Sequence, residues 1–339
     1  MSTAIGYAEW ERKLVNVVDN PGDTNFAADA VMAVVATDVG VIAVGVVDGI
    51  QVGTEKAHRL LTEAGVPMMV FVTKIDKERA DFDKILADAR NAFGGSVVPL
   101  ALPIGVEAGF NGVVDLIAQE ARVYSGPGQA RREPVPAAMA SKVQSAREML
   151  VEKLAEQDDE LIEKYFADGE LSVDDLKLAL GKGLKSGSVV PVLVGNPVTG
   201  AGVDLLLDIV TAYGPSPLDR APFKLRKGED STAIEPKADG PFLGHVFKTI
   251  VDVHAGKITL FRVLSGSLAP DGSFVNVATG TRERFGGIFK LLGKKQEPTT
   301  NAVLGDLVAV VKLKDTRTNH TLAAEAGAGE LVIDRKSVV

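Results

Sequence analysis

Apolar runs and helical patterns alternate along the first part of the chain. Three runs, at residues 14–18, 39–47 and 68–72, are apolar throughout rather than at every second position, and helix-like segments at 24–37 and 54–64 separate them. Strands without alternation are typical of a parallel sheet whose two faces are both covered by helices. The pattern therefore predicts an α/β fold with a doubly wound sheet.

A second pattern interrupts this sheet. After Asp76 the chain does not return to a clear core strand until residues 189–194. The interval contains strand-like residues at 97–102 and a long amphipathic helix at 137–166. We interpret residues from about 95 to 188 as an inserted α+β subdomain.

Local signals mark the helices that follow. Ser172 and Asp175 have the spacing of a capping box, which predicts the start of a helix. A helix at 202–213 is followed by a Gly-Pro-Ser-Pro segment that cannot continue it. We therefore expect the α/β domain to cover residues 1–220 and a polar linker to cover 221–240.

From residue 242 the pattern changes to short strands separated by turns. Strands at 8- to 15-residue spacing without a helical period are typical of a small antiparallel β-barrel. We predict this barrel at residues 241–325, followed by an unassigned tail at 326–339. The expected strands are 244–249, 257–263, 273–277, 285–292 and 307–311.

Residues 30–47 have the length of a short membrane span, since the stretch is eighteen residues long and mostly apolar. Asp38 and Gly40 interrupt it. We interpret it instead as a buried helix that ends near Thr37, followed by a buried strand at 39–47, and we expect no membrane association.

Composition excludes several kinds of site. The chain of 339 residues has no Cys and four His, which excludes a disulfide framework, a thiolate zinc site and a cysteine nucleophile. The net charge of −8 argues against general affinity for nucleic acid. Residues 1–240 carry about −12 and residues 241–325 about +4, a contrast that suggests two modules with different partners, although a basic face is most often simply solvated.

The tetrapeptide Asp19-Asn20-Pro21-Gly22 follows the first apolar run. We expect Asp19 to lie at the carboxyl edge of the sheet, where ligands bind in such folds. A carboxylate there suits Mg²⁺, directly or through water, and the amide of Gly22 is suited to a close approach to a terminal phosphate. Taken alone, the tetrapeptide is more often an ordinary strand-to-helix turn.

The tetrapeptide Thr73-Lys74-Ile75-Asp76 follows another apolar run. The two carboxylate oxygens of Asp76 match the two N–H donors on the edge of guanine, an arrangement that adenine does not satisfy. The aliphatic stem of Lys74 is suited to lie against the base. Taken alone, this motif is more often a charged loop after a strand.

The order and spacing of the motifs are more specific than either motif alone. A D-x-P-G strand end, a V-D-G strand at 47–49 and a K-x-D strand end about 57 residues after the first are the arrangement of a GTPase core. The chain resembles the translational GTPases, most closely elongation factor G and its relatives, over about residues 5–325. Further similar stretches lie at 48–56, 77–82, 103–105, 112–116, 305–307 and 313–316.

The resemblance implies a P-loop-type GTPase sheet, GTP or GDP with Mg²⁺ as cofactors, and the ribosome, both its RNA and its proteins, as partner of a monomeric cytoplasmic protein. It implies that Asp19 is the Mg²⁺ ligand and that Asp23 occupies the place of a histidine that positions the attacking water. The residues expected to contact the nucleotide are Asp19, Asn20, Pro21, Gly22, Thr73, Lys74, Asp76, Gly195 and Asn196.

The sequence departs from the family pattern at several points. It contains no G-x-x-x-x-G-K-[ST] segment to hold the phosphates, and the threonine of the first switch is also missing. Asn20 replaces a threonine, Asp23 a histidine and Thr73 an asparagine. Asn196-Pro197 replaces a Ser-Ala pair, and Pro197 lacks the backbone N–H on which that guanine contact relies.

These observations support two main hypotheses. The first is that the chain is a fragment of a GTP-hydrolysing elongation factor G-like protein that acts in translation, with the missing segments in a longer parent, so that this chain alone binds GTP weakly or not at all. The second is a catalytically inactive pseudo-GTPase that serves as a ribosome-binding module. A scaffold without a ribosomal role is a third alternative, and whether the chain itself is an enzyme is left open.

Overall fold

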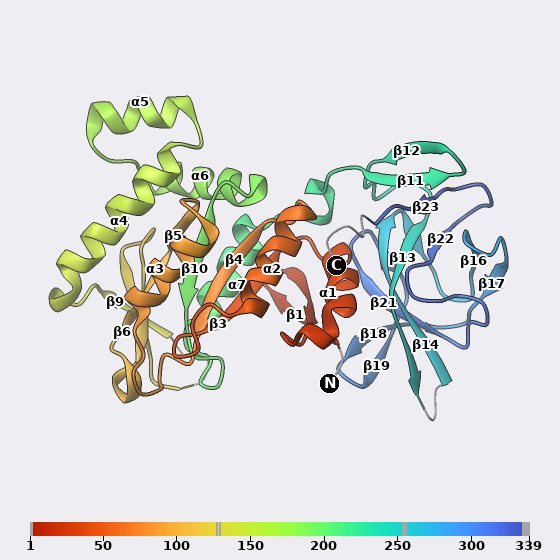
Figure 1. Cartoon of the computed structure of the whole chain (residues 1–339), viewed down its shortest axis with the longest axis horizontal. Helices are drawn as coiled ribbons and strands as arrows, with labels where there is room; N and C mark the ends of the chain where they lie inside the picture. Colours follow the sequence, from red (N-terminus) through yellow and green to blue (C-terminus); the bar gives the residue numbers. More distant parts are fainter. Residues whose placement is uncertain (1–2, 127, 129, 253–255, 334–339) are drawn as a thin grey trace. The chain divides into compact units, whose positions relative to one another are not determined.

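The chain divides into two compact units. The computed structural model describes residues 3–126, 128, 130–252 and 256–333 (Figure 1). Unit 1 comprises Met1–Asp38 and Pro215–Val339, and unit 2 comprises Val39–Gly214. Unit 2 is therefore continuous in sequence, whereas unit 1 is built from two separate segments.

A four-stranded parallel sheet forms the centre of unit 2, in the order β3-β4-β10-β5. Every residue of β10 is buried, as are the first five residues of β4, which explains why these strands are apolar throughout. The strands are β3 (Gly40–Gly45), β4 (Met68–Thr73), β5 (Val97–Pro99) and β10 (Val190–Val194). This arrangement confirms the predicted α/β fold.

Helices cover the sheet of unit 2. α2 (Val52–Glu63) packs beside α3 (Phe82–Phe93), and both lie in front of the sheet in Figure 1. α6 (Val173–Ser186) packs beside α7 (Val203–Tyr213). The start of α6 confirms the predicted capping box, because the Ser172 hydroxyl accepts a hydrogen bond from the Asp175 amide at 3.1 Å.

The expectation of no core strand between Asp76 and residue 189 was wrong. β5 pairs with β10 inside the parallel sheet, and the Leu100 amide then donates to the carbonyl of Val192 at 2.9 Å. The predicted strand at 97–102 is therefore two strands in two sheets. Its sequence is apolar without interruption, so its periodicity does not show where one sheet ends and the next begins.

The inserted subdomain begins immediately after this point with a four-stranded antiparallel sheet in the order β6-β7-β8-β9. Each strand pairs with the next along the chain, as in a meander. The strands are β6 (Ala101–Ile104), β7 (Gly112–Asp115), β8 (Glu120–Tyr124) and β9 (Ala130–Pro134), with the short 3₁₀ turns η2 (Glu107–Gly109) and η3 (Ala137–Met139).

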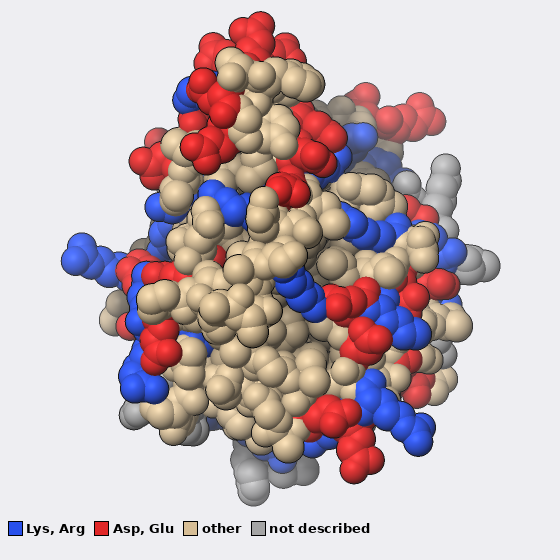
Figure 2. Space-filling view, turned by 90° about the vertical axis from the view of Figure 1, so that its left-hand side faces the viewer, with Lys and Arg blue, Asp and Glu red and all other residues tan. Residues whose placement is uncertain are grey.

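The predicted long helix at 137–166 is two helices, α4 (Ala140–Ala155) and α5 (Asp159–Asp168) (Figure 1). The chain breaks because the Asp158 carboxylate accepts a hydrogen bond from the Glu160 amide at 3.1 Å and so caps a new helix. The predicted apolar stripe was correct in its residues, since Val143, Leu150, Leu154 and Leu161 are all buried. Figure 2 shows the acidic side chains of α5 gathered at the top of one face of the molecule, above a broad area with few charges.

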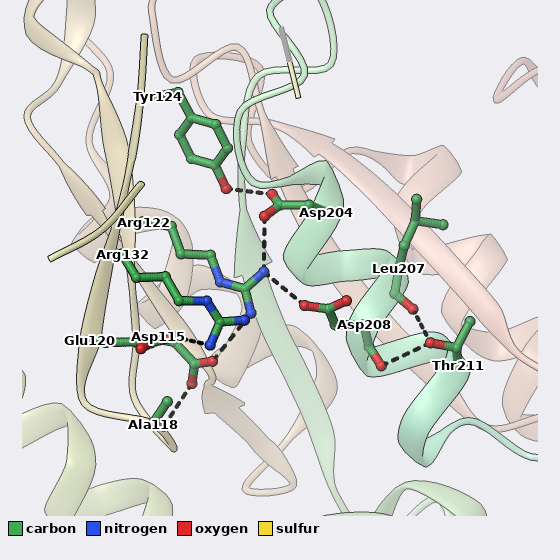
Figure 3. A network of polar contacts seen from close by, with 10 residues as sticks. All are labelled: Asp115, Ala118, Glu120, Arg122, Tyr124, Arg132, Asp204, Leu207, Asp208 and Thr211. Carbon is green, nitrogen blue, oxygen red and sulfur yellow. Dashed lines mark hydrogen bonds and ion pairs between the residues drawn. The ribbon is translucent and has the colours of Figure 1, made fainter. Parts of the chain in front are cut away.

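One arginine joins the inserted sheet to helix α7 (Figure 3). The Arg122 side chain is 7% exposed, and its Nη1 atom lies 2.9 Å from Oδ2 of Asp204 and 2.8 Å from Oδ2 of Asp208. Its Nη2 atom lies 3.8 Å from Oδ2 of Asp115. The Tyr124 hydroxyl also donates to Asp204, and burial together with this carboxylate raises the pKa of Tyr124.

The barrel of unit 1 is an eight-stranded antiparallel sheet in the order β17-β16-β22-β13-β14-β21-β18-β19. Its interior contains the aromatic side chains of Phe242, Phe261, Phe274 and Phe285. The main strands are β13 (Leu243–Asp252), β14 (Gly256–Ser265), β16 (Ser273–Asn276), β17 (Arg282–Arg284), β18 (Ile288–Leu292), β19 (Lys295–Thr299), β21 (Leu307–Val311) and β22 (Thr321–Ala323), with the short pair β15 (Ser267–Leu268) and β20 (Ala302–Val303). This sheet confirms the predicted antiparallel domain.

The predicted buried strand at 14–18 does not join the parallel sheet. β2 (Lys13–Asp19) pairs antiparallel with β1 (Ala4–Trp10), and none of its seven residues is buried. The hairpin turn uses Glu11 and Arg12 at φ 46° and 61°, a conformation usually signalled by Asn-Gly. Without that signal the sequence did not indicate the hairpin partner, and an apolar run alone does not specify which strand it joins.

The stretch at 30–47 divides as predicted into the end of α1 (Ala27–Val35), which follows the 3₁₀ turn η1 (Thr24–Phe26), and strand β3. Within unit 1, α1 packs against β13, where Ala36 joins an apolar cluster with Phe247 and Ile258. Among the described residues, no helix is both long and apolar enough to cross a membrane.

The predicted linker at 221–240 is a β-hairpin. β11 (Phe223–Lys227) pairs with β12 (Asp230–Ile234) and also with β23 (Glu330–Leu331), which lies in the predicted tail. The segment is mainly polar, but Phe223 and Leu225, two residues apart on β11, are buried, and their packing holds the hairpin in place. The 3₁₀ turn η4 (Pro217–Asp219) precedes it, and residues 334–339 lie outside the described part of the chain.

We expect Arg122→Met to reduce the free energy of unfolding by about 3 to 5 kcal/mol, because it leaves three neighbouring carboxylates without their shared cation. Urea unfolding measures the change. Arg132→Met is the matched control, since Arg132 is 66% exposed and pairs only with Glu120 in the described residues, so its loss should cost about 1 kcal/mol or less. Equal losses for both variants would contradict a central role for Arg122.

The buried ring of His245 should make the stability of the protein depend on pH. Its ring is fully buried, neither ring nitrogen has a hydrogen-bond partner among the described residues, and burial lowers its pKa from 6.5 to about 4. Between pH 6.5 and 4 the His245 ring is protonated in the unfolded state but not in the folded state. The free energy of unfolding therefore has its full value above pH 6.5 and decreases by about 1.4 kcal/mol per pH unit as the pH falls toward 4. His245→Leu should lose this slope in urea unfolding measured from pH 7.5 to 4.5, and parallel slopes for the two proteins would refute the assignment.

Candidate nucleotide-binding site

Two of the predicted nucleotide segments meet at one edge of the unit 2 sheet. β4 and β10 are parallel neighbours, with Val72 opposite Val194, and the Gly195 amide donates to the carbonyl of Val72 at 2.9 Å. Thr73 ends β4, and Lys74 and Asp76 follow it, while Gly195 and Asn196 follow β10. Since ligands bind beyond the carboxyl ends of parallel strands, this edge is the candidate site.

The charged residues after β4 are held by neighbouring charges. Nζ of Lys74 lies 2.6 Å from Oδ2 of Asp48, and Oδ2 of Asp76 lies 2.8 Å from Nζ of Lys77. The hydrogen bond from Lys77 holds the pKa of Asp76 below its ordinary value, although partial burial acts in the opposite direction. Asp76 is therefore ionised at neutral pH and presents only acceptors, which is what recognition of two guanine donors requires.

Backbone strain accompanies this segment. Lys74 has φ 60° and Arg79 has φ 65°, both in the left-handed region that non-glycine residues rarely adopt. The Glu107 carboxylate accepts a hydrogen bond from the Arg79 amide at 2.7 Å, and the Glu107 amide donates to the carbonyl of Ile75 at 2.9 Å. Residues held in such conformations concentrate at binding sites, because surrounding contacts must maintain them.

Asp48 and Glu107 are the supporting residues that sequence reasoning missed. Neither lies near the K-x-D motif in sequence, since Asp48 is 26 residues before Lys74 and Glu107 is 28 residues after Arg79. The V-D-G stretch contained the signal for Asp48, but only the fold shows that its carboxylate reaches Lys74. No local pattern marks Glu107.

The turn after β10 has a specific shape. A Cβ atom on Gly195 would lie 2.4 Å from the carbonyl oxygen of Ala201 and 2.7 Å from Cζ of Phe71, so this position requires glycine. The Asn196 side chain is buried, and its Oδ1 accepts a hydrogen bond from the Val198 amide at 3.0 Å. The Asn196 carboxamide therefore braces its own turn across Pro197.

Thr73 is likewise engaged within the protein. Its hydroxyl donates to the carbonyl of Val44 on the neighbouring strand β3, with an oxygen-to-oxygen distance of 3.3 Å. A threonine side chain is too short to reach as far as an asparagine carboxamide. The position thus ties β4 to β3 and contributes less to the ligand edge than the family pattern implies.

The D-x-P-G residues belong to unit 1. Asp19 ends β2 with an exposed side chain that has no polar partner among the described residues. The Asn20 Oδ1 atom accepts a hydrogen bond from the Thr3 hydroxyl at 2.8 Å. Gly22, which follows Pro21, has open space where a Cβ would lie, so close packing within the protein does not explain the glycine.

Asp23 has a structural role at the start of the next helix. Its Oδ1 atom accepts a hydrogen bond from the Asn25 amide at 2.9 Å, and its carbonyl accepts one from Phe26 at 3.0 Å. This is the arrangement of an Asx turn before a helix. The carboxylate is exposed, so its second oxygen stays accessible to water.

The metal chemistry of the described residues is limited. No group of three or more His, Asp or Glu side chains among them is arranged to hold a metal ion. Mg²⁺ is often held by only one or two carboxylates together with waters and phosphates.

A separate cavity of about 500 Å³ lies in the inserted subdomain, lined by residues that include Val143, Arg147, Tyr165 and Leu171. It shares no lining residue with the nucleotide motifs. The Nη1 atom of Arg147 donates to the carbonyl of Ile117 at 3.0 Å, so part of this side chain is held by the protein.

Comparisons with known proteins agree with this geometry. The family described as elongation factor Tu GTP binding domain matches residues 1–216, and the family described as elongation factor G domain 2 matches residues 241–325. An elongation factor G-like protein of Thermotoga maritima is 34% identical over 324 residues, which cover 95% of this chain and 47% of that protein. The chain thus spans about half the length of this curated relative.

A solved structure gives the same result. The crystal structure of a protein from Thermus thermophilus matches with a TM-score of 0.83 and 28% identity, covering 96% of this chain and 46% of that one. The first family match alone covers more than half of the chain, and the second accounts for the barrel. The chain therefore belongs to the translational GTPases, within the group of elongation factor G-like proteins.

Proposed function

We propose that this chain is part of a guanine-nucleotide-dependent translation factor, and that its unit 2 carries the half of the nucleotide site that recognises guanine. The observation that carries the proposal is the shared sheet edge, where Asp76 follows β4 and Gly195 follows the adjacent β10. Asp76 reads the two donors of the base, and the stem of Lys74 lies along its face. Asp48 and Glu107 position these residues.

The phosphate half of the site is assigned to the D-x-P-G segment with Mg²⁺. In this proposal Asp19 contacts the ion, directly or through water, and Asn20, Pro21 and Gly22 lie along the phosphates, with the Gly22 amide as donor. Asp23 orients water through its exposed oxygen. The 339 residues contain no G-x-x-x-x-G-K-[ST] segment, so the backbone amides and the lysine that bind the phosphates in this family are missing. In this proposal the chain alone therefore binds GTP weakly and does not hydrolyse it at a useful rate.

The partner in this proposal is the ribosome, through its RNA and proteins, in the cytoplasm, with the chain as a monomer. The relative from Thermotoga maritima is described as an elongation factor G-like protein, and this chain matches 47% of it. The contrast of charge between residues 1–240 and 241–325 supports different contacts for the two modules.

A pseudo-GTPase that binds the ribosome without catalysis is the second candidate. It is favoured by the side chains of Thr73 and Asn196, which form hydrogen bonds within the protein at the positions where the family contacts the base. The DNA upstream of the codon for Met1 distinguishes the candidates. An in-frame G-x-x-x-x-G-K-[ST] segment would refute the pseudo-GTPase, and a start codon with a ribosome-binding site at Met1 would count against the fragment.

The base-recognition half is testable in this chain. With Mg²⁺ present, we expect GDP to bind with a dissociation constant on the order of 1 mM, or about −4 kcal/mol, since the chain has no phosphate-binding loop to add to the contacts with the base. Chemical-shift titration of the isotope-labelled chain with GDP and ADP measures affinity and preference. Asp76→Asn should remove the preference for guanine by replacing one acceptor with a donor.

Asp88→Asn is the matched control. Asp88 pairs with Lys84 on the exposed surface of α3, and its substitution by Asn changes the net charge by the same amount as Asp76→Asn. It should bind GDP as the unchanged protein does. Tight GDP binding by the unchanged chain would contradict the proposed weakness, and an unaltered preference in Asp76→Asn would contradict the role of Asp76.

A further inference from the structure

The inserted sheet reaches the segment after β4 through the turn that joins β6 to β7, residues 105–111. Within this turn, the Glu107 amide donates to the carbonyl of Ile75 at 2.9 Å, and the Glu107 carboxylate accepts a hydrogen bond from the Arg79 amide at 2.7 Å. One residue of the insertion therefore holds the backbone on both sides of Asp76.

These contacts maintain a strained backbone. Lys74, Arg79 and Glu107 have φ 60°, 65° and 55°, all in the left-handed region that residues other than glycine rarely adopt. Such conformations persist only where the surrounding contacts outweigh their cost. Loss of the Glu107 carboxylate would release the Arg79 amide, so the loop that carries Asp76 would relax from its present shape.

The same sheet reaches the segment after β10 through β8. The Tyr124 hydroxyl donates to Asp204, and Nη1 of Arg122 lies 2.9 Å from Oδ2 of the same carboxylate (Figure 3). Asp204 lies in the first turn of α7, directly after the turn that the Asn196 amide closes by donating to the carbonyl of Ala201 at 2.8 Å. The insertion therefore also holds the second segment of the base site.

The two points of attachment are joined within the sheet. The Tyr124 amide donates to the carbonyl of Asn111, the last residue of the turn at 105–111, at 2.9 Å. β7, which follows this turn, pairs with β8 at each of its four residues. The turn that contacts Arg79 and the hydroxyl that contacts Asp204 thus belong to one continuous hydrogen-bonded piece.

We propose that the inserted sheet controls guanine affinity, with Glu107 and Tyr124 as its positioning residues. Glu107 acts through the Arg79 amide, and Tyr124 acts through Asp204. The inference rests on the proposed function, because it concerns the same base site. Guanine binding fixes both segments and so fixes the sheet. Since linkage between two sites is reciprocal, a molecule that binds the insertion and shifts its sheet changes guanine affinity by the same factor.

Glu107→Ala should weaken GDP binding about fivefold, the effect of one hydrogen bond, and leave ADP binding unchanged. Glu107→Gln should restore GDP binding, because its amide oxygen still accepts from Arg79. Chemical-shift titration with Mg²⁺ present measures both nucleotides. Glu133→Ala is the matched control, since Glu133 lies on β9 of the same sheet, is 44% exposed and pairs with Arg131. No weakening, equal weakening for GDP and ADP, or a loss that Glu107→Gln does not restore overturns the proposal.

Amide hydrogen exchange in the chain without nucleotide tests the link through the sheet. Tyr124→Phe should accelerate exchange of the Arg79 amide, to which Tyr124 makes no bond. Glu107→Ala should likewise accelerate exchange of the Asn196 amide. Tyr165→Phe, on α5 of the same subdomain, is the control and should change neither rate. Exchange that changes only at directly bonded amides overturns the proposal.

The titration separates this inference from the proposed function. A chain that binds GDP no better than ADP contradicts the proposed function and the control by the insertion together. A guanine preference that Glu107→Ala leaves intact contradicts the control alone.

Discussion

The placement of Arg122 is the constraint on which the architecture of unit 2 depends. A single guanidinium contacts carboxylates from β7 and from two turns of α7, so it ties the inserted sheet to a helix of the nucleotide-binding core (Figure 3). α7 begins directly after the turn that contains Gly195 and Asn196. A Cβ on Gly202, at the start of this helix, would lie 2.4 Å from the carbonyl of Val194, which shows how closely helix and strand approach. The Arg122 contacts therefore hold the inserted sheet against the helix that follows the turn after β10.

Each unit contains a buried arginine that is paired with carboxylates. Arg122 lies among three carboxylates, and the Tyr124 hydroxyl also donates a hydrogen bond to one of them, Asp204. Arg262 pairs with Asp38, with 2.5 Å between Nη2 and Oδ1. Removing one partner of such a pair leaves a buried charge uncompensated, so each pair constrains the unit that contains it.

Sequence reasoning succeeded where a local signal and a tertiary contact agreed. The capping box at Ser172 and the apolar strands β4 and β10 were predicted correctly, because their local sequence patterns favour the same structure that their tertiary contacts stabilise.

Sequence reasoning failed where the structure of a segment depends on which distant segment it packs against. β2 was given to the wrong sheet because Glu11 and Arg12 do not resemble a hairpin turn, and the supposed linker contains β11 because Phe223 and Leu225 bury their side chains in a largely polar segment. The K-x-D segment was located by its pattern. The supporting roles of Asp48 and Glu107 were not predictable, since these residues lie 26 and 28 residues in sequence from the residues that they contact, Lys74 and Arg79.

The split of unit 1 into Met1–Asp38 and Pro215–Val339 has a consequence for the order of events during synthesis. All of unit 2 has left the ribosome once Gly214 is clear of the exit tunnel, so this unit is free to fold while the barrel is still being made. The hairpin of β1 and β2 and helix α1 emerge before unit 2 but must wait for β13, β14 and β18, the strands against which they pack. During that interval the apolar side chains of this segment have no surface to cover them, so the segment stays exposed until the later strands have been made.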